Sequence, residues 1–417
     1  MKLALATKAI LPMIAVTTRD TVNFPEVLAH VSGKKVTAWN PAKADPFKTG
    51  GLYFWICPKG FAARLPLEQI YEQCLNAGCT LVVANVNQME PVFFDAGEVE
   101  VPKDMLFNAL NDIVEDKKLA NALSRSLGGV TLKEANELAS LTMADAGKLT
   151  PDAIMATRKG FFQASRGFTQ IDTAQQYYHP SEELSAWVEE EGGYFLTGND
   201  FRLRARGVLF EGVPGTGKTS GAKWIAHKLG VPLFRLDIAS AKNKYVGESE
   251  QNLAAALSRL DNEEPCVVLI DEIEKIFASS SSTSDAGTTT GMLSQILWWL
   301  QEHKSRVLTI MTTNKVKALP PELHRPGRID KRITTNGLVE ADAKVFAKRL
   351  VTTFGELKGE IPSVEINGIV KRAFQEATIP DTVPKEVPHA DVTEQVHKFV
   401  KHKITVSKGL SDIFNIK

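Results

Sequence analysis

An apolar run before residue 212 leads directly into a glycine-rich loop that ends in lysine and threonine. The glycines at Gly212, Gly215 and Gly217 let backbone N–H groups turn toward an anion and let that anion come close. A lysine after the last glycine can reach the β- and γ-phosphates of a nucleotide, and a hydroxyl after that lysine can hold Mg²⁺. Residues 220–229 have helical spacing, so the positive end of a helix would also point at the phosphates. The residues predicted to bind a nucleoside triphosphate are Gly212, Val213, Pro214, Gly215, Thr216, Gly217, Lys218, Thr219 and Ser220.

A second apolar run, residues 266–270, ends in Asp271 and Glu272. A continuous apolar run is typical of a strand buried on both faces, and open α/β sheets carry functional groups at the carboxyl ends of their strands. We therefore expect Asp271 to contact the cofactor and to hold a metal ion together with Thr219, and Glu272 to polarise an attacking water. Alone, such an acidic pair is more often a solvated loop, and the phosphate loop before it favours the catalytic interpretation.

Two more segments carry candidate catalytic groups. Asn314 follows the apolar run 307–312, where its amide could position the same water or sense the γ-phosphate. Arg325 and Arg328 flank a Pro-Gly turn, and guanidinium groups on such a turn can reach a phosphate bound by a neighbouring molecule. The simpler alternatives are a turn asparagine and a surface turn with salt-bridged arginines.

In order and spacing, residues 212–219, 266–272, 312–314 and 323–330 resemble the Walker A, Walker B, sensor-1 and arginine-finger elements of AAA ATPases. The resemblance implies ATP and Mg²⁺ as cofactors and ATP hydrolysis as the activity. It also implies a homo-oligomeric ring, most often a hexamer, in which Arg325 and Arg328 complete the site of the adjacent subunit.

Residues 243–250 resemble the first pore loop of AAA proteins that thread polypeptides, such as spastin and katanin. The substrate-contacting residues implied by this resemblance are Lys244, Tyr245 and Val246. A tyrosine offers a large, rigid surface that any extended chain can contact. The same segment also reads as a helix N-terminus. The Ser-, Thr- and Gly-rich stretch 278–291 predicts a mobile loop at the position of a second pore loop.

The segments 232–237, 285–302 and 404–408 narrow the resemblance to a little-characterised AAA group first noted as conserved plastid reading frames. That group has an N-terminal half like a degenerate, silent nucleotide-binding fold. The usual Gly-Gly hinge is replaced here by His179-Pro180, and Ser363-Val364 is the nearest match to the second sensor, so neither an adenine contact nor a sensor-2 arginine is assigned.

The expected fold class is α/β: a three-layer P-loop NTPase (AAA) module with a small C-terminal helical lid, preceded by a degenerate α/β domain with a helical extension. Short strands at residues 11–17, 36–39, 52–57 and 80–86 alternate with helices at 24–31 and 67–75, which favours an open sheet. The predicted parts are 1–101 (degenerate RecA-like domain), 102–164 (helical), 165–180 (linker), 181–337 (AAA large subdomain) and 338–417 (lid). Residues 10–17 are expected to be a first strand rather than part of a secretory signal.

The 417 residues are 43% apolar and 24% charged with a net charge of zero, as in an ordinary globular protein. The four cysteines have no metal-ligand or redox spacing, which favours the reducing cytoplasm, and no run is long enough to span a membrane. The leading interpretation is an ATP-driven ring that remodels or threads a protein. The alternatives are a nucleotide-gated assembly factor whose N-terminal half docks a partner, and a nucleic-acid-linked AAA machine such as a loader or recombination assistant. Scattered lysines give only weak support to nucleic acid as a partner.

Overall fold

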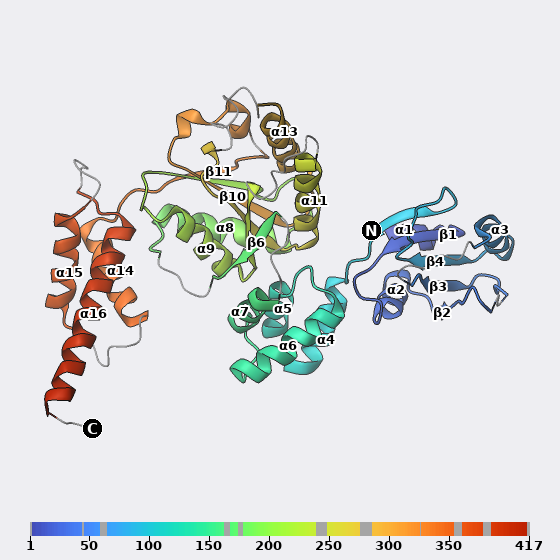
Figure 1. Cartoon of the computed structure of the whole chain (residues 1–417), viewed down its shortest axis with the longest axis horizontal. Coiled ribbons are helices and arrows are strands. Elements are labelled where there is room, and N and C mark those ends of the chain that lie inside the picture. The colour runs from blue at the N-terminus through green and yellow to red at the C-terminus, as the bar shows by residue number, and fades with distance from the viewer. Residues whose placement is uncertain are drawn as a thin grey trace. The chain divides into compact units, whose positions relative to one another are not determined.

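The computed structural model divides the chain into two compact units, Met1–Thr157 and Arg158–Lys417, and each unit has its own sheet (Figure 1). The structure describes residues 2–43, 46–58, 65–161, 167–173, 178–238, 248–275, 286–325, 327–353, 361–377 and 385–414. Within these residues, no helix is both long enough and apolar enough to cross a membrane.

The first unit contains a sheet of five parallel strands in the order β2-β3-β4-β1-β5. The strands are β1 (Met13–Thr17), β2 (Val36–Ala38), β3 (Leu52–Ile56), β4 (Thr80–Ala84) and β5 (Phe94–Glu98). One face packs on α1 (Lys2–Lys8) and α2 (Phe24–Ser32), and the other packs on α3 (Leu67–Ala77). The four strands and two helices predicted from alternation are confirmed to within two residues at each end.

Two elements of this unit differ from expectation. Residues 2–8 form a helix with Leu3, Ala6 and Thr7 buried, and β1 begins only at Met13, not at residue 10. The helix escaped prediction because two turns contribute only a few periodic positions. Strand β5 was also missed, since its Asp, Gly and Glu are poor strand formers and it pairs with β1 alone.

Four helices follow the sheet, where the sequence pattern predicted a helical region without a number of helices. They are α4 (Lys103–Val114), α5 (Lys117–Ser126), α6 (Leu132–Ala146) and α7 (Pro151–Phe161). The capping box of α6 is present: Glu134 N donates to Thr131 Oγ1, and Thr131 N donates to the Glu134 carboxylate. Pro151 opens α7, where its missing N–H costs nothing.

The second unit has a six-stranded sheet in the order β11-β7-β10-β9-β8-β6. Its strands are β6 (Phe168–Ile171), β7 (Gly207–Glu211), β8 (Leu233–Leu236), β9 (Cys266–Ile270), β10 (Val307–Thr313) and β11 (Lys331–Thr334). All pairs are parallel except β6 with β8. The expected linker 165–180 is therefore wrong for Phe168–Ile171. Strand β6 has only four residues, which alternate between buried and more exposed, and so short an alternation is hard to recognise in a sequence.

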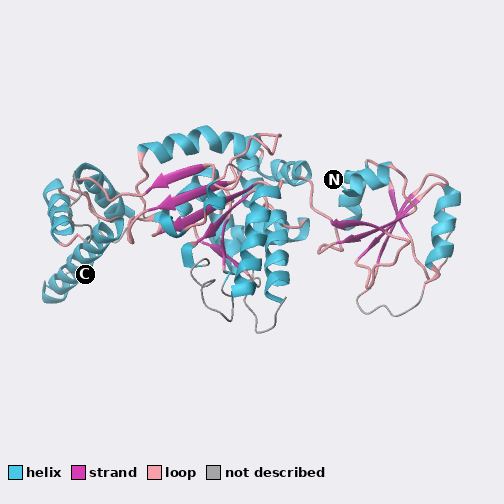
Figure 2. Ribbon diagram, turned by 90° about the horizontal axis from the view of Figure 1, so that it is seen from above, coloured by secondary structure: helices cyan, strands magenta, loops and turns pink. Residues whose placement is uncertain are grey.

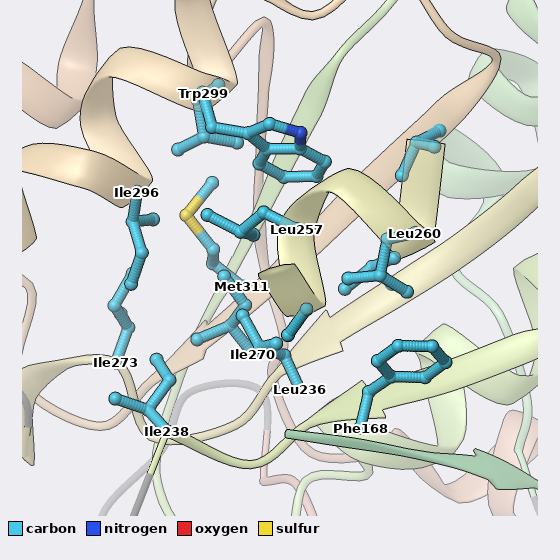
Figure 3. Close-up of a cluster of buried hydrophobic side chains, with 14 of the residues drawn as sticks. Phe168, Leu236, Ile238, Leu257, Leu260, Ile270, Ile273, Ile296, Trp299 and Met311 are labelled. Carbon is cyan, nitrogen blue, oxygen red and sulfur yellow. The ribbon is translucent and has the colours of Figure 1, made fainter. Parts of the chain in front are cut away.

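Helices cover both faces of this sheet, which gives three layers (Figure 2). The helices α8 (Glu182–Thr197) and α9 (Lys218–Leu229) pack on one face. On the other face, α11 (Glu248–Asn262) and α13 (Ala286–Glu302) bury Leu257 and Trp299 against the strands (Figure 3). Strands β9 and β10 are buried along their whole length, so the sheet is a rigid support for the loops at its ends.

The loop predicted at residues 278–291 is wrong from residue 286 onward, because α13 begins there. Its Thr- and Gly-rich first turns are poor helix formers, and packing of the following apolar residues against α11 outweighs that preference. Residues 278–285 lie outside the described residues.

Three helices, α14 (Glu340–Thr353), α15 (Ser363–Gln375) and α16 (His389–Phe414), form the predicted C-terminal lid around an apolar core of their own. A bridge between Leu338 and Val387 brings the start of α16 back beside the end of the sheet. The N-terminal end of α16 therefore reaches the loop after β7.

Candidate functional site

The loop between β7 and α9 requires glycine at the positions the sequence singled out. The φ angles of Gly212, Gly215 and Gly217 are 155°, 84° and 87°, in the region that other residues rarely adopt. A Cβ on Gly212 would lie 2.3 Å from the carbonyl oxygen of Thr335. The loop is thus held in a fixed concave shape, and its backbone N–H groups lie at the N-terminal end of α9.

Lys218, the first residue of α9, folds back over this loop. Its Nζ donates hydrogen bonds of 2.8 Å to the carbonyl oxygens of Gly212 and Val213. Burial lowers the pKa of Lys218, and the carboxylates of Glu274, Asp271 and Glu272 partly oppose that shift. The ammonium group of Lys218 could exchange these carbonyl oxygens for the oxygens of a phosphate as hydrogen-bond acceptors without a large change in its position.

Asp271 lies where the carboxyl end of β9 meets the start of α9. The hydroxyls of Thr312 and Thr219 donate to its Oδ1 over 2.5 and 3.3 Å. A hydroxyl beside a carboxylate suits Mg²⁺, which takes oxygen ligands and usually keeps waters and phosphate oxygens as its other ligands. Thr219 and Asp271 are therefore the residues that could hold the metal.

Glu272 sits next to this pair in a strained backbone conformation, with a φ of 51°. Its N–H donates to Thr312 Oγ1 over 2.8 Å, and its carboxylate forms an ion pair with Lys275. Glu272 thus lines the pocket in a backbone conformation that non-glycine residues rarely adopt.

Asn314 also lines the pocket, directly after β10, and a residue missed by sequence reasoning holds it there. The N–H of Asn314 donates to Glu274 Oε1 over 3.1 Å, and Glu274 is only 8% exposed. Asn314 Oδ1 and Glu274 Oε2 are buried and have no hydrogen-bond partner among the described residues. Each of these oxygens can still accept a hydrogen bond, and Asn314 lines the pocket, where a water molecule or an ammonium group could donate one. The only sequence signal for Glu274 was its position two residues after Glu272.

The lid completes the pocket, which has a volume of about 590 Å³. Helix α16 contributes five lining residues: His389, Ala390, Thr393, Glu394 and His397. The N–H of Ala390 donates to the carbonyl oxygen of Gly215 over 3.1 Å, which joins the lid to the phosphate loop. Ser363-Val364, the nearest sequence match to a second sensor, is not among the lining residues: Ser363 is the first residue of α15 and Val364 is 80% exposed, while the start of α16 lines the pocket.

An aromatic stack fixes the contact between lid and loop. The rings of Tyr178 and His389 stack with centroids 5.0 Å apart and planes 14° apart. Tyr178 also packs against Gly217 and Gly221, whose lack of a side chain leaves room for the ring. His389 Nε2 lies 3.1 Å from the carbonyl oxygen of His179. Tyr178 and His179 thus lie between the lid and the phosphate loop and contact the lid through His389. No sequence pattern indicated a role for Tyr178 or His389.

Asp330 holds the described residues beside the arginine turn through hydrogen bonds, and the two arginines of this segment differ in their contacts. Asp330 Oδ1 accepts from Gly327 N, and its Oδ2 accepts from the N–H groups of Arg206 and Gly207 at the start of β7. Arg328 donates to the carbonyl oxygen of Glu322 and to Gln301 Oε1, over 2.8 and 2.9 Å. Arg325 is exposed.

Neither Arg325 nor Arg328 lines the pocket of its own chain, which otherwise brings together most of the predicted site. Of the predicted residues, the pocket lining includes Pro214, Gly215, Gly217, Lys218, Thr219, Ser220, Asp271, Glu272 and Asn314. Gly212, Val213 and Thr216 shape the loop from behind, through the contacts of Lys218 and Thr335. Lys244, Tyr245 and Val246 lie outside the described residues.

Comparisons with known proteins agree with this geometry. Residues 208–336 match the family model "ATPase family associated with various cellular activities (AAA)". The "Uncharacterized AAA domain-containing protein ycf46" of Guillardia theta is 36% identical over 36% of this chain and 30% of its own length. The ycf46 protein of Trieres chinensis is 28% identical over 56% of this chain and 49% of its length. The peroxisomal ATPase pex6 of Schizosaccharomyces pombe is 32% identical over 41% and 18%. The chain thus spans less than half the length of these curated relatives.

The stacked histidine makes the contact between lid and loop sensitive to pH. Burial lowers the pKa of His389 from 6.5 to about 4. Below pH 6.5 the unfolded chain takes up a proton that the folded chain does not, so stability should fall as pH falls. Each pKa unit corresponds to about 1.4 kcal/mol, so the contribution of His389 to the loss between pH 7 and pH 5 should be about 2 kcal/mol.

This loss is measured by unfolding the second unit at several pH values. The substitution His389→Phe keeps a stacking ring without a titratable group, and it should remove the part of the pH dependence that His389 contributes. The part contributed by His303, whose pKa burial also lowers to about 4, should remain. His402→Phe changes an exposed histidine of the same helix and should leave the dependence intact. Equal slopes for the parent and His389→Phe would contradict the assignment.

Proposed function

Given that this chain carries an AAA domain across residues 208–336, we propose that it is a Mg²⁺-dependent ATPase that works as a ring, most simply a hexamer, and remodels or threads a protein. The observation that carries the proposal is the convergence of Lys218, Thr219, Asp271, Glu272 and Asn314 on one pocket beside the phosphate loop. This set contains a cation for phosphate, two oxygen ligands for a metal, a carboxylate and an amide, as phosphoryl transfer to water requires.

In this proposal the residues divide the work of hydrolysis. Gly212–Thr219 binds the triphosphate, with the ammonium of Lys218 on the β- and γ-phosphates. Thr219 and Asp271 would hold Mg²⁺, which would supply positive charge beside the phosphate oxygens. Glu272 orients and polarises the attacking water, and Asn314 holds it from the other side. Glu274 positions Asn314 by accepting its backbone N–H.

The proposed ring is supported by the composition of the pocket lining. Phosphoryl transfer gains from a guanidinium near the γ-phosphate, and none of the described residues that line the pocket is an arginine. The exposed Arg325, in the segment that Asp330 holds through hydrogen bonds, could supply that group to a second copy of the chain. Arg328 is committed to Glu322 and Gln301, so in this proposal it mainly holds the turn.

The proposal that the substrate is a polypeptide rests on the sequence alone. The match of residues 243–250 to a pore loop supports threading of a polypeptide past Tyr245. The N-terminal unit is the proposed docking site for a protein partner. The four cysteines are free and buried, which fits the reducing cytoplasm that we propose as its location.

The catalytic assignment predicts opposite behaviour for two substitutions. Lys218→Ala should abolish nucleotide binding, because it removes the cation that compensates the phosphate charge. Glu272→Gln should keep ATP binding and lose turnover, because an amide cannot polarise the water. Titration with a fluorescent ATP analogue and a phosphate-release assay measure the two properties. Equal ATPase rates for the parent and Glu272→Gln would contradict the role of Glu272.

The shared-site assignment predicts that Arg325→Ala lowers the rate of ATP hydrolysis by up to about 10³-fold, and Arg328→Ala by less. Mixing Arg325→Ala subunits with Lys218→Ala subunits should restore activity, because some sites then combine an intact loop with an intact arginine. In the matched control, Arg325→Ala is mixed with the double variant Lys218→Ala/Arg325→Ala, which should restore nothing. If the first mixture is also inactive, the arginine does not act between subunits.

The threading assignment predicts that Tyr245→Ala spares basal ATP hydrolysis and abolishes remodelling, while Tyr245→Phe keeps both, because the ring supplies the contact. The substrate is identified by a pull-down with Glu272→Gln in ATP, and its unfolding is then followed with each variant. A normal unfolding rate with Tyr245→Ala would favour the nucleotide-gated assembly factor.

A further inference from the structure

The two sheets of the molecule have the same strand order. With the strands of each unit numbered along the chain, the first sheet reads second, third, fourth, first, fifth, as β2-β3-β4-β1-β5. The second sheet has this order in β8-β9-β10-β7-β11 when the numbering starts at β7; the edge strand β6, which precedes β7 in the chain, is added outside β8. In each unit the loop after the first strand therefore occupies the same place beside the fourth strand.

The residues at these matching places differ in the two units. In the second unit, the loop after β7 leads into Lys218-Thr219, and β9 ends in Asp271-Glu272. In the first unit, the loop after β1 leads into Phe24-Pro25, and β3 is followed by Cys57-Pro58. An asparagine follows the fourth strand in both, Asn314 after β10 and Asn85 after β4. The first unit thus lacks the phosphate-binding cation and the acidic pair.

A carboxylate of the chain itself fills the corresponding loop of the first unit. Asp20 is 4% exposed and accepts three hydrogen bonds. The backbone N–H of Asn23 donates to Oδ1 over 3.0 Å, and the side-chain amide of Asn23 donates to Oδ2 over 2.8 Å. The third bond, 3.0 Å long, comes from Lys133 N, which is 113 residues away.

These contacts place the Asp20 carboxylate at the N-terminal ends of two helices. Asn23 precedes α2 and makes no side-chain cap of its own, and Lys133 lies in the first turn of α6. Both helix ends favour an anion. Burial raises the pKa of Asp20, but the hydrogen bonds from Asn23 and Lys133 together hold it below its usual value. The group is therefore a buried anion, and the bond to Lys133 distinguishes it from an ordinary local turn.

Asn85 and Arg19 fasten the same loop to the strands and to α6. The Asn85 side chain accepts from Thr18 N over 2.8 Å and donates to Thr18 O over 3.0 Å. Asn85 does so with a φ of 60°, a conformation that costs free energy. Arg19 donates to Glu98 of β5 and to the carbonyl oxygen of Gly129, over 3.0 and 2.7 Å.

We propose that residues 18–23 are an anion-binding loop whose ligand is the Asp20 carboxylate, and that this internal ligand latches α6 onto the N-terminal sheet. The loop has the position of a phosphate loop and keeps the affinity of helix ends for negative charge. Its anion now belongs to the chain. The four-helix segment and the sheet then move as one body, whatever the second unit binds.

The test removes the carboxylate and offers inorganic phosphate in its place. All variants carry Lys218→Ala, so that phosphate bound by the second unit does not enter the comparison. Asp20→Ala should speed hydrogen exchange at the Asn23 and Lys133 amides by about tenfold or more, because both lose a charged acceptor. It should also lower the unfolding temperature of the first unit by about 5–10 °C.

Inorganic phosphate should reverse both changes in Asp20→Ala, because the vacated space then accepts an oxyanion, while chloride at the same ionic strength should not. Glu26→Ala is the matched control: it removes an exposed carboxylate from the first turn of α2 that is not a partner in these bonds. This variant should exchange as the parent does and show no response to phosphate. If Asp20→Ala does not fold, Asp20→Asn keeps the shape with an uncharged acceptor, and it should exchange at an intermediate rate.

Two results would overturn the proposal. If Asp20→Ala, or Asp20→Asn where Ala does not fold, exchanges at the parent rate at Lys133, Asp20 does not latch α6. If Asp20→Ala exchanges faster and phosphate has no more effect than chloride, the loop is an ordinary turn without an anion site. Neither result depends on whether the second unit hydrolyses ATP.

Discussion

Both units of this molecule depend on the attraction between the backbone N–H groups at a helix N-terminus and a negatively charged group. A strand that leads through a tight loop into a helix leaves backbone N–H groups that have no partner within the helix. In the second unit these donors lie in a loop shaped by Gly212, Gly215 and Gly217, which leaves room for phosphate. In the first unit Asp20 supplies the negative charge. One topology therefore yields a ligand site in one half and an internal contact in the other.

The presence or absence of side chains in these loops decides which outcome each half has. A Cβ on Gly212 would collide with the carbonyl oxygen of Thr335, so this position of the loop after β7 has no room for a side chain. The loop after β1 contains Arg19 and Asp20, and both point their charged groups at other parts of the same unit. Gly212 thus keeps one position of the loop after β7 without a side chain. In the loop after β1, Asp20 instead brings a carboxylate to the helix ends.

The sequence predicted the parts of the site that lie at strand ends and in the phosphate loop, because there chemistry restricts the residue types. Lys218, Asp271 and Asn314 could be named for this reason. Tyr178, Glu274 and His389 could not, because their roles depend on which segments meet in space. His389 lies 171 residues after Lys218 and reaches the loop only because the bridge between Leu338 and Val387 returns the chain to the sheet.

The fold was predictable to a similar extent. Strands with long apolar runs, such as β9, appeared from sequence at their true bounds, since burial on both faces leaves little choice of residue. Edge strands and short helices did not: β5, β6 and α1 each bury only a few side chains, so little periodicity distinguishes them from loops. The Thr-rich start of α13 shows the opposite case, in which packing imposes a helix on residues that do not favour one.

Strand β7 connects the two ends of the proposed shared site. Its carboxyl end enters the phosphate loop, and its amino end is bonded through Asp330 to the turn that carries Arg325 and Arg328. Gly207, its first residue, has no room for a side chain, since a Cβ would lie 1.7 Å from the carbonyl oxygen of Arg328. Five residues of strand span about 17 Å and hardly stretch. A shift of the phosphate loop would therefore be carried along β7 to the arginine turn, and β10 and β11 on either side keep the strand from bending.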